Sequence, residues 1–172
     1  MKKLTLTLLM TCSFSVHAMA QECENPVTQA DVVSAQEQWG KAIVAIGASE
    51  TPREEAKNTL DTLYAYDMGA VLFKPTLAAE EPFRGTHDAA LSYFVGGDIA
   101  EDNGFALAPY TAVRFDNEGI ITQCDTAMAM GEYYFTKTDG EDVRVEYSFG
   151  YIQDESGDLK INLHHSSLPY SQ

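Results

Sequence analysis

The chain ends in a segment that combines strand-like alternation with an imidazole and a hydroxyl group, Leu159–Tyr170. Successive side chains of a strand point to opposite faces, so Ile161 and Leu163 lie on the same face as His165 and Ser167. We expect this face to be buried, because it begins with two aliphatic residues. His165 and Ser167 then lie where the buried face ends, as polar groups at the rim of an apolar core. Small polar sites in apolar pockets are built in this way.

Two other interpretations of the segment remain open. The opposite face of the same strand carries His164 and Ser166, and this alternative register would place that pair in the core instead. A third interpretation is a frayed C-terminal strand whose polar residues are all solvated. We place the site on His165 and Ser167, because they continue the aliphatic face.

Two further polar residues lie at or within apolar segments. Thr76 ends the apolar strand 71–76, and Tyr93 lies inside the apolar helix 89–95. A buried tyrosine hydroxyl usually has a hydrogen-bond partner. Each residue also has a structural explanation, Thr76 as a strand terminator and Tyr93 as a core residue. We expect Lys74 and Arg84 to be structural or solvated.

The sequence does not indicate a metal site. After the first twenty residues the histidines are His87, His164 and His165, and a three-histidine zinc site would need all of them. His164 and His165 are adjacent in a strand and point to opposite faces, so they cannot easily bind one ion. There is no CxxC, GxSxG or HExxH motif and no phosphate-binding glycine loop. Most carboxylates fall in turns or on exposed helix faces.

The first twenty residues have the features of a secretory signal peptide. Lys2 and Lys3 precede the apolar run 4–10, and the small residues of 18–20 form a cleavage site before Gln21. We therefore expect residues 1–20 to be removed on export, to a secreted and periplasmic location. Residues 21–172 then form a single domain. The apolar run is too short to span a membrane.

Cleavage would leave two cysteines, Cys23 and Cys124. Two cysteines in an exported protein are a candidate disulfide, although the sequence does not show that they meet.

The charge of the chain limits its partners. The formal net charge is −15, and it becomes −17 when Lys2 and Lys3 are lost with the leader. Such a negative field argues against nucleic acid and anionic membranes as partners. A neutral small molecule would be indifferent to it.

Periodicity and turn residues predict helices first and strands afterwards. Thr28 is an N-cap for an amphipathic helix, and Thr51, Pro52 and Glu54 predict a capping box at the start of a second helix that runs to about Tyr66. A strand, a short helix and a series of hairpin strands follow, with the expected ranges 70–76, 86–95, 111–115, 120–124, 127–137, 143–152 and 159–167. Residues 116–119 are expected to form a turn.

This order predicts an α+β fold, in which N-terminal helices pack on a curved antiparallel sheet. A curved sheet wrapped around helices forms a cone with a pocket inside. By analogy, this is the architecture of the nuclear-transport-factor-2-like superfamily, which includes both enzymes and binding modules.

Several segments, taken in order, carry a resemblance to one family. They are VLFKPT at 71–76, ALSYFVGG at 90–97, GFAL at 104–107, VRF at 113–115, AMAMGEYYF at 127–135, VEYSFGY at 145–151 and LHHSSLPY at 163–170. Together they resemble the iota class of carbonic anhydrases, which is related to the calcium/calmodulin-dependent kinase association domain. The resemblance covers about residues 38–170.

The resemblance implies a homodimeric lyase that interconverts carbon dioxide and bicarbonate. It implies a small-molecule substrate, bound by hydroxyl groups in an apolar pocket. No cofactor is expected, although some members are described as using manganese or zinc. The family's threonine and tyrosine fall on Thr76 and Tyr93, and its His-x-Ser pair falls within the doubled HHSS. We place this pair on His165 and Ser167, because they continue the face that carries Ile161 and Leu163.

The expected roles follow from the chemistry of hydration. Thr76 and Ser167 would donate to bicarbonate oxygens, and Tyr93 would hold the attacking water and relay its proton. His165 would orient Ser167 or accept the proton. Without a metal, the sequence offers no obvious group to generate hydroxide.

Two alternative functions remain at this point. One is a non-catalytic oligomerisation or ligand-binding module of the kinase association-domain type. The other is a cyclase or isomerase of the same fold, which would need a buried carboxylate as its base. Asp67, Asp88 and Asp98 are the nearest candidates for that base.

Overall fold

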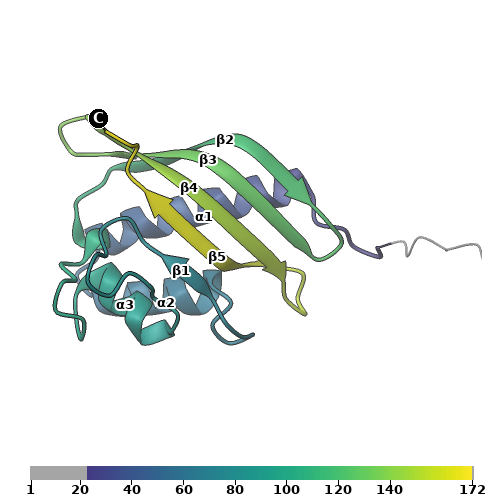
Figure 1. The fold of residues 1–172 in the computed structure, drawn as a ribbon, viewed down its shortest axis with the longest axis horizontal. Helices are drawn as coiled ribbons and strands as arrows, with labels where there is room; N and C mark the ends of the chain where they lie inside the picture. Colours follow the sequence, from purple (N-terminus) through teal and green to yellow (C-terminus); the bar gives the residue numbers. More distant parts are fainter. Residues whose placement is uncertain (1–22, 172) are drawn as a thin grey trace, which may run out of the picture.

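The computed structural model describes residues 23–171. The elements are α1 (Gln29–Ala48), α2 (Pro52–Leu63), β1 (Leu72–Lys74), α3 (His87–Val95), the 3-10 helix η1 (Phe105–Leu107), β2 (Ala112–Thr122), β3 (Thr126–Thr136), β4 (Asp142–Gln153) and β5 (Leu159–Ser167). Figure 1 shows the five strands as one sheet with the three α-helices on one side of it. The predicted α+β class is confirmed.

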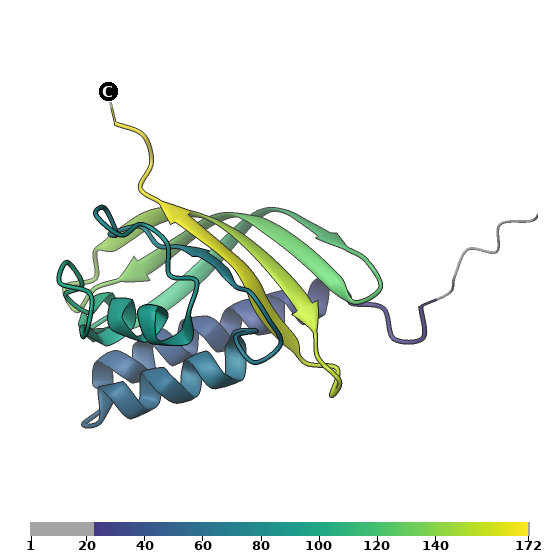
Figure 2. The same ribbon diagram turned by 60° about the horizontal axis from the view of Figure 1, so that its bottom comes forward.

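The sheet has the strand order β1-β5-β4-β3-β2. Strands β2 to β5 form an antiparallel meander, but the edge strand β1 pairs with β5 in parallel. The sheet is therefore mixed and not wholly antiparallel as expected. Figure 2 shows the sheet curving over the helices, which leaves its outer face uncovered by any element of the described chain.

Helix α1 begins and packs as its sequence predicts. Thr28 accepts a hydrogen bond from the Asp31 backbone, and the Asp31 side chain accepts one from the Thr28 backbone, which completes a capping box. The apolar stripe that includes Trp39 and Ile43 is fully buried against the sheet. In α2, Pro52 occupies the first turn as predicted, but the Thr51 side chain makes no capping hydrogen bond, so the capping box expected there is absent.

The turn predicted at residues 116–119 is wrong. Strand β2 is continuous through it, with a bulge between Asn117 and Gly119. The side chain of Asn117 exchanges hydrogen bonds with Gln36, at 2.8 and 2.9 Å, and accepts one from the Tyr147 hydroxyl. Opposite the bulge stands Gly131, where a Cβ atom would collide with the backbone oxygen of Asp116. The bulge therefore lies where Asn117 makes these hydrogen bonds, and β2 continues through it without reversing direction.

A second bulge, in β5, overturns the expected face of the last strand. Tyr151 pairs with Ile161 and Gly150 pairs with Leu163, so Asn162 is an extra residue. An extra residue reverses the alternation of side chains beyond it. Ile161 and His164 therefore both point inward, and Leu163 points outward. The expectation that His165 and Ser167 continue the buried face is wrong.

Cys23 and Cys124 form a disulfide that joins the N-terminal segment to the turn between β2 and β3. The backbone N–H of Val27 also donates to the Cys124 carbonyl, at 3.1 Å. The predicted signal peptide lies outside the described residues. None of the helices between residues 23 and 171 is both long and apolar enough to cross a bilayer.

Candidate active site

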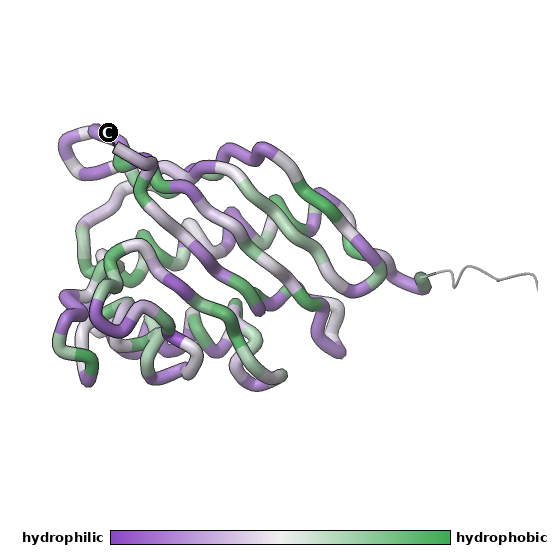
Figure 3. Tube along the Cα trace, viewed as in Figure 1, coloured by the Kyte–Doolittle hydropathy of each residue, from purple (hydrophilic) through white to green (hydrophobic). Residues whose placement is uncertain are grey.

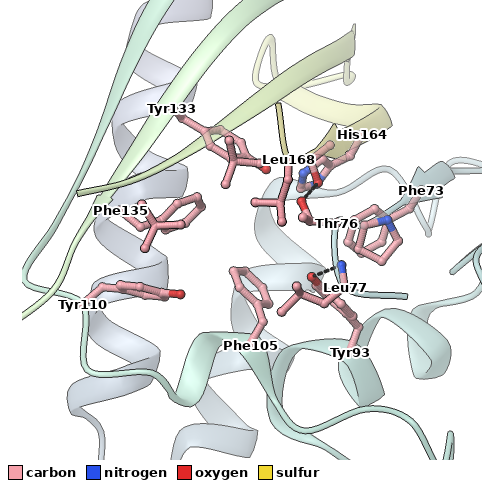
Figure 4. Close-up of a pocket in the computed structure, with 14 residues that line it drawn as sticks. Phe73, Thr76, Leu77, Tyr93, Phe105, Tyr110, Tyr133, Phe135, His164 and Leu168 are labelled. Atoms are coloured by element: carbon pink, nitrogen blue, oxygen red, sulfur yellow. Dashed lines mark hydrogen bonds between the residues drawn. The ribbon is translucent and has the colours of Figure 1, made fainter. Parts of the chain in front are cut away.

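A cavity of about 70 Å³ lies between the sheet and α3, where β3, β4 and β5 come close to the segment after β1. Figure 4 shows aromatic side chains on most of its walls, among them Phe73, Phe105 and Phe135. A buried water needs roughly 10–15 Å³ of such volume, so the cavity suits a molecule of a few non-hydrogen atoms. Ligand pockets for drug-sized molecules are several times larger.

Two hydroxyl groups face each other across the β1–β5 pair. Thr76 follows β1, Ser166 lies near the end of β5, and the Thr76 hydroxyl donates to Ser166 Oγ at 2.9 Å. The parallel pairing of Lys74 with His165 brings the two chains side by side here. Because Ser166 accepts this hydrogen bond, its own hydroxyl hydrogen remains available to a ligand.

Tyr93 projects into the cavity from α3, which begins at its predicted N-cap, Thr86. The Tyr93 hydroxyl accepts a hydrogen bond from the backbone N–H of Leu77, at 3.3 Å (Figure 4). Burial raises the pKa of Tyr93 far above its usual value near 10. Tyr93 is therefore a neutral phenol whose hydrogen can be donated into the cavity, and a poor base.

His164 is buried, at 2% exposure, and lines the cavity. Its ring stacks on Phe73 with centroids 4.5 Å apart, and the edge of Phe149 packs against it. The Tyr64 hydroxyl lies 2.8 Å from His164 Nδ1. Burial lowers the pKa of His164 well below 6.5, with a smaller contribution from the adjacent His165. His164 is therefore neutral near pH 7.

Tyr133 is a cavity residue that sequence reasoning did not single out. It lies on β3 at 2% exposure, and Figure 4 shows its hydroxyl directed toward His164 and Thr76. Burial raises the pKa of Tyr133, and the hydroxyls of Ser166 and Thr76 oppose this in part. The alternation in 127–135, which buries Ala127, Ala129 and Tyr133, was the signal that could have placed it.

The structure brings together half of the predicted site residues. Thr76 and Tyr93 line the cavity, but His165 and Ser167 do not. His165 is exposed on the outer face, and the Ser167 hydroxyl lies 3.5 Å from the Glu146 carboxylate. The alternative register is the one that reaches the cavity, with His164 and Ser166.

Arg84 is structural, but it is fully buried rather than solvated. It forms ion pairs with Asp102 at 2.7 Å and with Glu101 at 3.3 Å. The Glu101 carboxylate also accepts the backbone N–H groups of residues 79–81, and these hydrogen bonds are the main reason that its pKa falls to about 2. These contacts fix the loop after Thr76 and Leu77 beside the cavity.

Within residues 23–171, no group of three His, Cys, Asp or Glu side chains is arranged to hold a metal ion. His87 contacts Asp61 at 3.0 Å and is not among the cavity residues. The described lining of the cavity also includes no Asp or Glu, so Asp67, Asp88 and Asp98 lie outside it.

Comparison with known proteins gives a consistent result. The family model described as metal-independent carbonic anhydrase matches residues 30–168. The metal-independent carbonic anhydrase of Nostoc sp. (strain PCC 7120) is 40% identical over an alignment of 155 residues, and the match covers 85% of this chain and 76% of that protein. A crystal structure of a cyanobacterial iota-carbonic anhydrase complexed with bicarbonate matches with a TM-score of 0.84 and 36% identity, over 90% of this chain and 100% of that one.

More distant structures share the fold alone. A putative calcium/calmodulin-dependent protein kinase II association domain from Xanthomonas campestris matches with a TM-score of 0.57 and 22% identity, over 89% of this chain and 100% of that one. A putative dehydratase of the NTF2-like family from Streptomyces avermitilis matches with a TM-score of 0.51 and 14% identity, over 83% and 96% of the two chains. The expected fold is therefore confirmed.

Proposed function

The chain belongs to the family of metal-independent carbonic anhydrases, and on that premise we propose that its cavity is where carbon dioxide and bicarbonate are interconverted. The observation that carries the proposal is the composition of the cavity. It is small and mostly aromatic, and it holds the hydroxyls of Thr76, Tyr93 and Ser166 and the imidazole of His164. An apolar cavity suits carbon dioxide, and hydrogen-bond donors suit the anion that forms from it.

The reaction needs a water placed against the carbon and donors placed against the oxygens. As the water oxygen forms a bond to carbon, one C=O electron pair moves to its oxygen, and a proton leaves the water. We assign Ser166 and Tyr93 as donors to the developing negative charge, and Thr76 as the residue that orients the Ser166 hydroxyl. In the desolvated cavity such donors act more strongly than they would in water.

The charge of the protein assists product release. At −15 overall, the chain does not attract the neutral substrate, and it repels bicarbonate. The family description supports turnover without a cofactor and does not support a requirement for manganese or zinc.

The test is carbon dioxide hydration by the purified mature chain after exhaustive chelation. We expect catalysis measured by stopped flow to persist, with no stoichiometric metal by elemental analysis. The matched control is the same preparation resupplied with manganese or zinc, whose rate should be unchanged. Loss of turnover on chelation and its recovery with one metal would contradict the metal-free mechanism.

The alternative functions are not favoured. An isomerase or cyclase would need a buried carboxylate base, and the described cavity lining has none. The likeness to kinase association domains is a likeness of fold.

We also propose that the chain forms a homodimer through the outer face of its sheet. A row of residues crosses all five strands there, and its aliphatic members are Leu72, Leu163, Met128 and Ile121. Three of them are at least 58% exposed, and Met130 is equally exposed in the next row. Figure 3 shows hydrophobic segments in these strands. An exposed apolar patch of this kind marks an interaction surface.

Light scattering would test the dimer. We expect twice the monomer mass for the mature chain, and a shift toward monomer for Met128→Glu. A control, Ser148→Glu, adds a charge to the same face outside the aliphatic row and should disturb assembly less. A monomeric wild-type chain at all concentrations would contradict the proposal.

For localisation, we propose that residues 1–20 are a signal peptide and that a single carbonic-anhydrase-like domain, residues 21–172, acts in the periplasm. The disulfide supports an oxidising compartment. Mass spectrometry of the exported protein should find Gln21 at its N-terminus. An intact N-terminus on a cytoplasmic protein would contradict this.

A further inference from the structure

The buried polar contacts behind His164 form a chain with a defined direction. Trp39 Nε1 lies 2.9 Å from the Tyr64 hydroxyl, and that hydroxyl lies 2.8 Å from His164 Nδ1. Trp39 and Tyr64 are both fully buried, so water does not reach these groups. His164 Nε2, the other ring nitrogen, is buried and has no protein partner.

The indole sets the direction of the chain. An indole N–H can only donate, so the Tyr64 oxygen accepts from Trp39. Tyr64 has one hydrogen of its own, and His164 Nδ1 is the remaining partner in contact with its hydroxyl. If Tyr64 donates to Nδ1, then Trp39 Nε1, the Tyr64 hydroxyl and Nδ1 all have a partner, and the ring proton of the neutral imidazole lies on Nε2.

The opposite arrangement costs more. If Nδ1 carried the proton and donated to Tyr64, the Tyr64 hydrogen would be left without a partner among the rings of Phe73 and Phe94. A buried unsatisfied donor costs about 1–3 kcal/mol. In the first arrangement the unpartnered group is Nε2–H, on the ring that lines the cavity, where a ligand can satisfy it.

We propose that Trp39 and Tyr64 are positioning residues that hold His164 as a neutral imidazole with its proton on Nε2, so that it donates a hydrogen bond to bicarbonate in the cavity. This rests on the proposed function for the identity of the anion, but the direction of the hydrogen-bond chain does not. His164 is then a donor to the reacting oxygens and not the base that removes the water proton. That proton leaves to another water.

The test is the protonation pattern of the histidine rings, read from long-range ¹H–¹⁵N correlation spectra of the ¹⁵N-labelled mature chain. His164→Gln assigns the His164 signals among those of His87 and His165. We expect Nε2 protonated and Nδ1 unprotonated near pH 7. Tyr64→Phe removes the donor to Nδ1, so the ring should become a mixture of both neutral forms. Carbon dioxide hydration should fall about tenfold, the equivalent of one neutral hydrogen bond.

The matched control is Tyr66→Phe. Tyr66 stacks on Tyr64, and its hydroxyl donates to the Arg84 carbonyl at 2.9 Å, so this variant loses a comparable hydrogen bond away from His164. Its His164 pattern should be that of the wild type. A wild-type proton on Nδ1, or an unchanged pattern in Tyr64→Phe, would overturn the proposal. The spectra need no turnover, so an inactive chain with the expected pattern would refute the proposed function and leave this inference standing.

Discussion

The two faces of β5 carry the same pair of residue types in different surroundings. On the inner face, His164 and Ser166 are at 2% and 3% exposure and meet Tyr64 and Thr76. On the outer face, His165 is exposed and Ser167 approaches Glu146. Residue type alone therefore does not make the site. The bulge at Asn162 decides which pair enters the cavity, and burial then gives that pair its chemistry.

The two faces should differ most when one hydroxyl is removed from each of them. Ser166→Ala should lower kcat/KM about 100-fold or more, because it removes a donor to developing charge and little volume. Ser167→Ala should change it less than about twofold. Stopped-flow hydration measures both, with thermal unfolding to exclude misfolding. Equal losses of kcat/KM in the two variants would contradict the placement of the site on the inner face of β5.

A second change separates stability from chemistry. The Cys23–Cys124 disulfide lies at the end of β3 away from the cavity residues Tyr133 and Phe135, and it closes a long loop. Replacing both cysteines with serine should lower the free energy of unfolding by about 2–4 kcal/mol. Turnover of the folded fraction should stay close to that of the wild type. Denaturant unfolding and initial rates should be measured on the same samples. An unchanged free energy of unfolding, or a loss of turnover in the folded fraction, would contradict this prediction.

A smaller effect on kcat is expected for Thr76, the hydrogen-bond donor to Ser166. Thr76→Val keeps the shape of the side chain but removes the hydroxyl that donates to Ser166 Oγ. Because one neutral hydrogen bond contributes about 1 kcal/mol, kcat should fall by roughly tenfold or less. The variant should be active but slower than the wild type. A loss as large as that of Ser166→Ala would mean that Thr76 itself contacts the substrate.

Acid should destabilise the fold through His164. The pKa of His164 is lowered in the folded chain, whereas in the unfolded chain it lies near 6.5. Below pH 6.5 the unfolded chain binds more protons, so the stability present above that pH is lost as pH falls, by at most about 1.4 kcal/mol per pH unit. His164→Gln should flatten this part of the profile relative to the wild type. Unfolding free energies from pH 7.5 to 5 would show the difference.

Much of the fold could be predicted from the sequence, because its signals are local. Thr28 and Pro52 mark the helix starts, and alternation marks β4, whose inner residues pack on Trp39 and its neighbours. Thr76 and Tyr93 were placed in the pocket through family segments rather than through periodicity. The pairing of Cys23 with Cys124 was predicted because two cysteines in an exported protein are a candidate disulfide.

The errors have one physical cause, since both large ones are bulges. A bulge forms where residues of the opposite strand and of the covering helix accommodate it. For β2, Gly131 leaves room for the backbone of the bulge, and Gln36 hydrogen-bonds to Asn117. Alternation within one strand carries no such information. The hydrogen bonds of Trp39 and Tyr64 to the site were missed for a related reason, because their partners lie at least 25 residues away in the sequence.

We infer that the inner face of β5 holds the anion without a metal, and a crystal structure of the mature chain soaked with bicarbonate would show whether it does. We predict a planar anion in the cavity within hydrogen-bond distance of Ser166 Oγ and His164 Nε2, with the Tyr93 hydroxyl alongside. No metal ion should lie between the anion and these groups. An anion bound at His165 and Ser167, or one bound through a metal ion, would contradict the account.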